Sequence, residues 1–113
     1  MRKKRPPTGV YLEESVEELY LSLREGSELK KAIDRGLDIL KENMLAGDSV
    51  RKKQIPQYYR DRFSVNNLYR LRLDRKRRLT YTILSDEEGK KVVILEVFPD
   101  HKSYDRRFGY KTS

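Results

Sequence analysis

The chain has 113 residues, a length typical of a single domain, and it carries a formal net charge of +8. It contains no cysteine and one histidine, which excludes a disulfide framework and a metal site built from several such ligands, and we expect no cofactor. No apolar run approaches the roughly 20 residues that span a bilayer, and the basic start leads into no hydrophobic segment. The sequence therefore predicts a soluble, cytoplasmic protein with no membrane partner.

The positive charge is concentrated in the second half of the chain. Residues 51–113 contain 17 Lys and Arg against 8 Asp and Glu, whereas residues 6–50 contain 5 against 10. A basic surface gains affinity for nucleic acid by neutralising phosphates and releasing their counterions. The alternative interpretation is the solvated surface of a charge-rich, heat-adapted protein, since 39% of the residues are charged.

The chain begins with a basic tail, MRKKR, and we expect residues 1–8 to be disordered and residues 9–113 to form one domain. A short edge strand is predicted at 9–12, where Pro6 and Pro7 limit its extension upstream.

Two amphipathic helices are predicted next. Ser15 and Glu18 form a capping-box pattern before apolar residues with helical spacing, which indicates a helix over 16–25. Ser27 can cap a longer second helix that is stopped by Gly47 as a C-terminal cap. Each helix has one apolar side and one charged side, so both are expected to pack, antiparallel to each other, on one face of a sheet.

The segment 47–65 lacks sustained periodicity and is interpreted as a basic, aromatic connecting loop. Strands are expected at 68–73 and 78–84, followed by a turn at 85–90 and a last strand at 92–98. The last strand is apolar on both faces, so it should lie inside the sheet. The expected fold is α+β in two layers, with both helices on one face of a mostly antiparallel twisted sheet of about four strands. The other face is expected to be open and basic.

Arginines alternate with apolar residues in the two strands of the predicted hairpin. Side chains two residues apart share one face of a strand, so Arg70 and Arg72 point away from Leu71, and Arg78 points away from Leu79. If the strands pair, their guanidinium groups can converge on one face. Such a face suits RNA, because a guanidinium offers a planar fork of donors to phosphate and stays charged.

The order of these elements, with the segments NNLYRLRL, RLTYTI and VVILEVFPDHKSYDRRFGY, resembles the RelE/ParE superfamily of toxins from type II toxin–antitoxin pairs, on its RelE and YoeB-like side. The resemblance covers residues 10–110. It implies a metal-independent endoribonuclease that cleaves mRNA on the ribosome, and a cognate acidic antitoxin as a further partner. The alternatives are a DNA gyrase inhibitor of the ParE type and a nucleic-acid-binding regulator without catalysis.

The resemblance also implies a set of catalytic residues. By position, Arg70 and Arg72 match basic residues on the family's second strand, Arg78 matches its third-strand arginine, and Tyr104 matches the tyrosine near its end. His101 lies close to a variable basic or histidine position of the family.

Metal-free RNA cleavage needs a deprotonated 2′-hydroxyl, stabilised charge on the phosphorus and a protonated 5′-oxygen. Arginines suit the charge, and histidine, which normally titrates near neutrality, suits proton transfer. Tyr104 could stack on an unpaired base or hydrogen-bond the 2′-hydroxyl. The general base is left open between His101, Tyr104 and Lys102, because arginine cannot take the role of a second-strand lysine.

Further basic residues are candidates for contacts with RNA backbone. They lie in the connecting segment, the hairpin turn and the C-terminal segment: Lys52, Lys53, Arg75, Lys76, Arg77, Lys102, Arg106 and Arg107. Structural alternatives exist for them. The turn residues are most simply solvated, and Arg106 and Arg107 could flank a C-terminal strand ending in Phe108 and Tyr110. The strand arginines could instead pair with Glu96 or with acidic residues of the helices.

Overall fold

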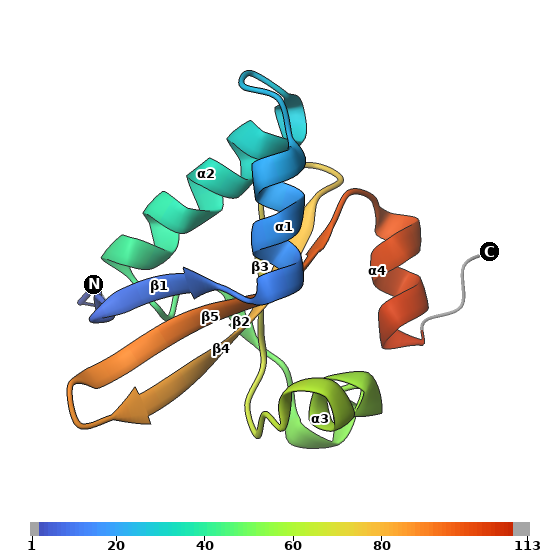
Figure 1. Cartoon of the computed structure of the whole chain (residues 1–113). Coiled ribbons are helices and arrows are strands. Elements are labelled where there is room, and N and C mark those ends of the chain that lie inside the picture. Colours follow the sequence, from blue (N-terminus) through green and yellow to red (C-terminus); the bar gives the residue numbers. More distant parts are fainter. Residues whose placement is uncertain (1–2, 110–113) are drawn as a thin grey trace.

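The computed structural model describes residues 3–109 of the chain. Over these residues the helices and strands follow one another as shown in Figure 1. In chain order they are β1 (Gly9–Leu12), α1 (Glu14–Ser22), α2 (Glu28–Glu42), β2 (Asp48–Ser49), the 3-10 helix η1 (Lys52–Gln54), α3 (Gln57–Phe63), β3 (Tyr69–Arg72), β4 (Arg78–Asp86), β5 (Gly89–Phe98) and α4 (His101–Phe108).

These residues form one five-stranded sheet with the strand order β1-β5-β4-β3-β2. The class is α+β, as predicted, but the sheet is mixed, because β1 runs parallel to β5 while the other neighbours are antiparallel. The edge strand at 9–12 is confirmed, and β5 lies inside the sheet as its two apolar faces predicted. The additional strand, β2, has two exposed residues, which is too short for an alternating pattern to reveal.

Helices α1 and α2 cover one face of the sheet, as the sequence predicted. The core on this face joins residues of the two helices to residues of β3, β4 and β5: Val16, Ala32, Leu40, Leu71, Leu73, Leu79, Tyr81, Val92 and Ile94. Ser27 caps α2, since its hydroxyl accepts the backbone N–H of Lys30 at 3.1 Å.

The prediction that the opposite face is open is wrong, because α3 and α4 pack against it (Figure 1). The segment interpreted as a connecting loop contains α3, and Tyr59 of this helix is buried against Leu68 and Leu95. Helix α3 has seven residues, which is too short for a helical period to emerge from the sequence.

A bulge in β5 decides which side chains reach this second face. Thr80 pairs with Glu96 while Tyr81 pairs with Ile94, so Leu95 is the extra residue. An unbroken alternation would place Glu96 beside Ile94, among the residues under α1 and α2. The bulge instead turns Glu96 towards α3 and α4.

The ends of both N-terminal helices differ from the predictions. Helix α1 begins at Glu14, because Glu13 and not Ser15 is the capping residue, and its carboxylate accepts the N–H of Ser15 at 3.0 Å. Helix α2 ends at Glu42 instead of continuing towards Gly47. The side-chain oxygen of Asn43 accepts the N–H groups of Arg5 and Leu45, which offers the backbone an alternative to further helical turns.

The C-terminal segment is a helix and not a strand that ends in Phe108 and Tyr110, and Tyr110 itself lies outside the described residues. Asp100 caps this helix by accepting the N–H of Ser103 at 2.8 Å, and that hydrogen bond lowers the pKa of the Asp100 carboxyl. An Asp three residues before Ser is a capping signal that the sequence carried.

The segment expected to be a disordered tail makes defined contacts from Lys4 onward. Lys4 pairs with Glu42 at 2.8 Å, the carbonyl of Arg5 accepts the N–H of Met44, and the N–H of Thr8 reaches the carbonyl of Lys90. Met1 and Arg2 lie outside the described residues.

Gly47 is required for a close approach between β2 and β3, not for a helix cap. A Cβ at this position would lie 2.5 Å from the carbonyl oxygen of Arg70 and 2.8 Å from the ring of Tyr81. Its N–H donates to the Tyr81 hydroxyl at 3.0 Å, a hydrogen bond that proline alone could not make at this position.

We therefore expect Gly47→Ala to destabilise the protein by about 1–3 kcal/mol, the usual scale of overpacking. Urea unfolding monitored by circular dichroism measures the change, with Ser49→Ala at an exposed position of β2 as the control. A Gly47→Ala protein as stable as the control would contradict the close approach.

Candidate functional site

Polar side chains line up across the sheet on the face that carries α3 and α4. Asp48, Arg70, Thr80 and Glu96 pair in sequence across β2, β3, β4 and β5. Paired residues of neighbouring strands project from the same face, so these four side chains form one row. The row runs from an exposed end at Asp48 to a half-buried end at Glu96.

The next row contains Arg72 and Arg78, which pair across β3 and β4. Together with the first row they enclose a hollow of about 230 Å³, lined by Asp48, Arg70, Arg72 and Arg78. We call this the arginine hollow. The prediction that the three strand arginines converge on one face is confirmed, and their alternation with apolar residues is the reason.

Tyr104 lies beneath the arginines on α4 and is 1% exposed. Its hydroxyl accepts a hydrogen bond from the Nη1 of Arg70 at 2.8 Å, and the guanidinium of Arg78 lies 4.7 Å from its ring centroid. Phe108 stacks on the ring with centroids 4.5 Å apart. A ring that is 1% exposed offers no surface on which an RNA base could stack, and its contacts orient Arg70 and Arg78.

His101 is exposed at the start of α4 and lies at the hairpin turn, outside the residues that line the hollow. Its Nε2 is 2.7 Å from the carbonyl oxygen of Arg75, which accepts a hydrogen bond when Nε2 carries the proton. In that tautomer Nδ1 remains an acceptor. One helical turn separates His101 from Tyr104, which contacts Arg70 and Arg78.

Glu96 is held by α3 and α4 instead of by the strand arginines. Arg107 donates to its carboxylate from Nε and Nη2 at 3.0 Å each, and the Tyr59 hydroxyl donates at 2.7 Å. Burial, together with the adjacent carboxylate, raises the pKa of Tyr59 far above its usual value, so this phenol stays a donor. The Arg107 guanidinium also lies 3.4 Å from the ring centroid of Tyr58. Arg107 is therefore engaged with Glu96 and Tyr58, as a residue that joins α4 to β5 and α3.

The hairpin turn is organised by Asp74. Its carboxylate accepts the N–H groups of Lys76 and Arg77 and pairs with the Arg77 guanidinium at 2.8 Å, with Arg35 of α2 at 3.5 Å. Arg77 is thus engaged within the turn, whereas Arg75 and Lys76 are exposed, as the solvated interpretation predicted.

The other basic candidates, Lys52 and Lys53 in η1 and Lys102 and Arg106 in α4, are exposed. Within residues 3–109, none of these four side chains forms an ion pair. They surround the α3 and α4 side of the molecule and remain available to a polyanion.

Asp48 is the residue of the site that the sequence analysis missed. It is the one carboxylate among the residues that line the arginine hollow. It lies opposite Arg70 in the register of β2 and β3. A two-residue strand carries no periodic signal, so nothing local separated Asp48 from an ordinary turn residue. Chemically, it adds a proton acceptor to a site otherwise built from permanent cations.

Comparisons of the chain with protein-family models, with curated proteins and with solved structures found no match. Within residues 3–109, no three His, Asp or Glu side chains gather as a set of metal ligands. No helix in this part of the chain combines the length and apolar character needed to cross a membrane. The geometry of the arginine hollow therefore carries the functional argument.

The Asp74 turn makes a pH-dependent contribution to stability. Partial burial acts to raise the pKa of Asp74, but the hydrogen bonds from Arg77 and from the backbone of Lys76 and Arg77 outweigh it and lower the pKa to about 2. A lowered folded-state pKa gives stability that is present above the unfolded value and is lost as pH falls from about 4 towards 2.

We expect Asp74→Asn to cost about 1–2 kcal/mol at pH 7 and to flatten the loss of stability between pH 4 and pH 2. Urea unfolding at pH 7, 4 and 2.5 measures both effects. Asp38→Asn, at an exposed position of α2, is the control. If the stability of the Asp74→Asn protein fell with acid as steeply as that of the unsubstituted protein, the Asp74 turn would not be the source of the pH dependence.

Proposed function

We propose that the protein is the toxin of a type II toxin–antitoxin pair, a ribosome-dependent endoribonuclease that cleaves mRNA without a metal. The observation that carries this proposal is the arginine hollow, where three guanidinium groups and one carboxylate meet at an accessible part of the sheet. The order of elements and the segments that resemble the RelE and YoeB-like toxins support the same assignment.

The arginines act on the scissile phosphate. Arg70 and Arg72 hold its oxygens, and Arg78 stabilises the charge that develops when phosphorus becomes five-coordinate. Tyr104 acts as a positioning residue, because its hydroxyl and ring fix Arg70 and Arg78. Guanidinium groups held in place before the reaction need no reorganisation when the charge appears.

The reaction requires one group that accepts a proton and another that donates one. Asp48, in the hollow, takes the proton of the 2′-hydroxyl, the 2′-oxygen attacks phosphorus, and the bond to the 5′-oxygen breaks. His101, at the hairpin turn and protonated on both ring nitrogens, gives its Nδ1 proton to the departing 5′-oxygen while Nε2–H stays with the carbonyl of Arg75. The products are a 2′,3′-cyclic phosphate and a free 5′-hydroxyl. Lys102 is the remaining alternative for the base.

The partners follow from the charge. Exposed cations in the turn, η1 and α4 bind ribosomal RNA and the mRNA backbone, and an acidic antitoxin neutralises the same surface in a resting cell. A cytoplasmic location is part of this proposal, since both the ribosome and mRNA are there.

The roles of the residues are separable by kinetics. Arg78→Ala should reduce single-turnover cleavage on programmed ribosomes by about 10² or more, the scale of one well-placed electrostatic donor, while ribosome binding changes much less.

His101→Gln keeps a donor for the Arg75 carbonyl but should slow cleavage and remove a limb of the pH–rate profile near neutrality. The double change Arg75→Ala and Lys76→Ala should weaken association and reduce its salt dependence, with chemistry nearly intact. The opposite order of severity in folded proteins would move the site elsewhere.

The reaction itself is tested in cells. Expression should halt translation and leave mRNA cut within coding regions that are being read, without a rise in DNA breaks. Mapping of 5′ ends with and without translation gives the answer, and Arg78→Ala is the matched inactive control. DNA breaks with intact mRNA would favour a gyrase inhibitor, and RNA binding without cuts would favour a regulator.

A further inference from the structure

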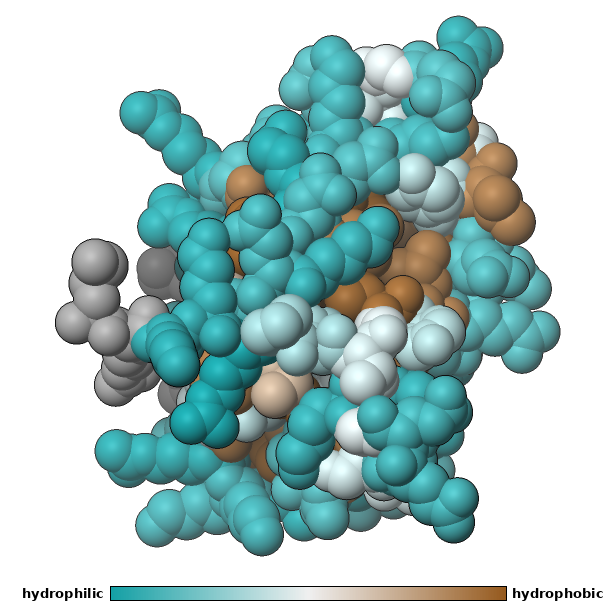
Figure 2. Space-filling model, turned by 90° about the vertical axis from the view of Figure 1, so that its left-hand side faces the viewer, coloured by the Kyte–Doolittle hydropathy of each residue, from teal (hydrophilic) through white to brown (hydrophobic). Residues whose placement is uncertain are grey.

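A second and larger hollow lies on the other side of the sheet, beyond the end of α2. It measures about 520 Å³ and is lined by residues from the N-terminal segment, the end of α2, β3, β4 and β5: Arg5, Met44, Leu45, Asn66, Asn67, Tyr69, Ile83, Leu84, Ser85 and Lys90. We call it the β4 groove. Figure 2 faces the side of the molecule where β1 begins, and it shows hydrophobic surface there within a hydrophilic surround.

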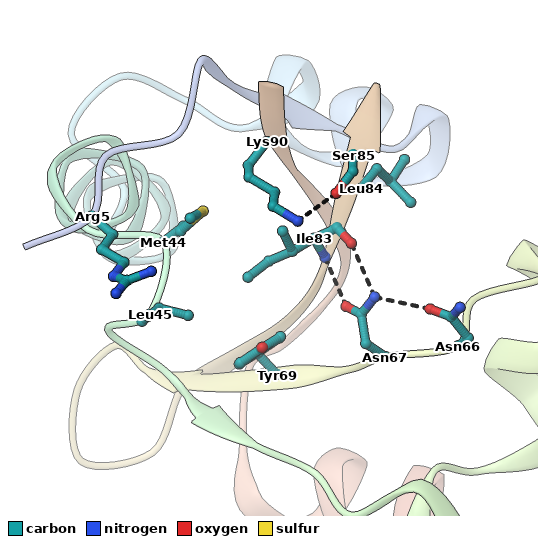
Figure 3. Close-up of a pocket in the computed structure, with 10 residues that line it drawn as sticks. All are labelled: Arg5, Met44, Leu45, Asn66, Asn67, Tyr69, Ile83, Leu84, Ser85 and Lys90. Atoms are coloured by element: carbon teal, nitrogen blue, oxygen red, sulfur yellow. Dashed lines mark hydrogen bonds between the residues drawn. The ribbon is translucent and has the colours of Figure 1, made fainter. Parts of the chain in front are cut away.

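Apolar side chains form the walls of this groove together with two cationic ones. Arg5, Met44 and Leu45 stand on one side and Ile83 and Lys90 on the other, as Figure 3 shows. Leu45 is 45% exposed although it is a large aliphatic residue. Helix α2 ends at Glu42, so its apolar stripe does not extend over this part of the sheet.

The sheet edge beside the groove is open. Strand β3 begins at Tyr69, opposite Tyr81, and the side chain of Asn67 then takes the place of a strand by bonding the N–H and the carbonyl of Ile83 at 2.9 Å each. Backbone groups alternate in direction along a strand, so Ser85, two residues further on, turns its N–H and carbonyl to the same side as Ile83. No strand of residues 3–109 lies beside Ser85 there.

The rim of the groove is positive. Within residues 3–109 no ion pair engages the guanidinium of Arg5, and the ammonium of Lys90 meets only the neutral hydroxyl of Ser85, at 2.6 Å. The nearby carboxylates of Asp86 and Glu88 are both paired with Lys91. An incoming carboxylate would therefore meet Arg5 and Lys90 without displacing another carboxylate.

We propose that the β4 groove docks an extended, acidic segment of a partner protein, which adds a short strand along the free edge of β4 at Ser85. Its backbone pairs with Ser85, alternate apolar side chains enter the groove over Ile83 and Tyr69, and carboxylates meet Arg5 and Lys90. Backbone pairing with one residue is too weak to hold a strand by itself, so the side-chain contacts in the groove must supply the rest of the affinity. This inference is independent of the proposed nuclease, since the groove and the arginine hollow share no lining residue.

The probe is a fluorescein-labelled nine-residue peptide whose alternate, groove-facing positions are Glu, Val, Val, Val and Glu, with Ser between them, so that valines and carboxylates share one face. It is compared by anisotropy with the same peptide carrying Lys in place of Glu. The acidic peptide should bind at least about tenfold more tightly, because only it complements Arg5 and Lys90. The double change Arg5→Glu and Lys90→Glu should reverse that preference. Amide chemical shifts in ¹⁵N spectra should change at Ser85 and its neighbours.

Two further variants test the geometry. Ser85→Pro removes an N–H that points away from β5, so the fold should persist while the acidic peptide loses about tenfold or more in affinity. Leu45→Asp should weaken binding similarly, whereas Ile39→Asp, at an equally exposed aliphatic residue of α2, should not. If Ser85→Pro does not fold, the comparison of Leu45 with Ile39 still decides.

Several results would overturn the proposal. They are equal binding of the two peptides, acidic-peptide binding that ignores both Ser85→Pro and Leu45→Asp, and shift changes confined to the arginine hollow. Sedimentation of the free protein is the remaining check, because a dimer that Leu45→Asp dissociates would identify a second copy of this chain as the occupant.

Discussion

Mutual repulsion among the three guanidinium groups of the arginine hollow is the constraint around which this structure is organised. Two like charges a few ångströms apart near a protein surface repel by on the order of 1 kcal/mol or more. Arg70, Arg72 and Arg78 nevertheless line one hollow. Tyr104 offers Arg70 a hydroxyl oxygen and Arg78 an aromatic face, and Asp48 brings one negative charge. A phosphate that enters would relieve the remaining repulsion, which is why such a site favours dianionic or bridging phosphate groups over neutral ligands.

This arrangement depends on a fixed position for α4, and that position depends on Glu96. The carboxylate faces α4 because of the bulge at Leu95, and it joins Arg107 of α4 to Tyr59 of α3. A half-buried charge must be paired to be tolerated, so each partner of Glu96 holds the others in place. The ion pair at Glu96 thus fixes the position of α4. Because Tyr104 lies on α4, the same ion pair also fixes its contacts with Arg70 and Arg78. Residues outside the arginine hollow thus set the geometry of those that line it.

The sequence predicted the parts of this structure that are periodic or capped. Alternation placed Arg70, Arg72 and Arg78 on one face, and the long apolar stripe after Ser27 located α2. It failed where elements are short, as in β2 and α3, or where a single extra residue changes the register, as at Leu95. Such features arise from pairing between distant segments and leave no local pattern.

Individual residues show the same limit. Asp48 gains its meaning from pairing with Arg70, and Arg107 is engaged with Glu96, which faces it across the fold. Gly47 was predicted to cap a helix because glycine is common just after the last helical residue. The structure instead requires a glycine because the carbonyl oxygen of Arg70 lies too close for a Cβ. In each case the residue type was informative, but the partner that decides its role lies more than ten positions away in the chain.

The two hollows are physically linked through the short edge made by β2 and β3. Tyr69 of β3 lines the β4 groove, and its neighbour Arg70 lines the arginine hollow on the other face. Tyr69 stacks on Tyr81 with centroids 5.2 Å apart, and the Tyr81 hydroxyl bonds both the carbonyl of Met44 and the N–H of Gly47. These contacts join the wall of the β4 groove to the backbone that places Asp48 and Arg70 in the arginine hollow, so one short edge of the sheet fixes the geometry of both.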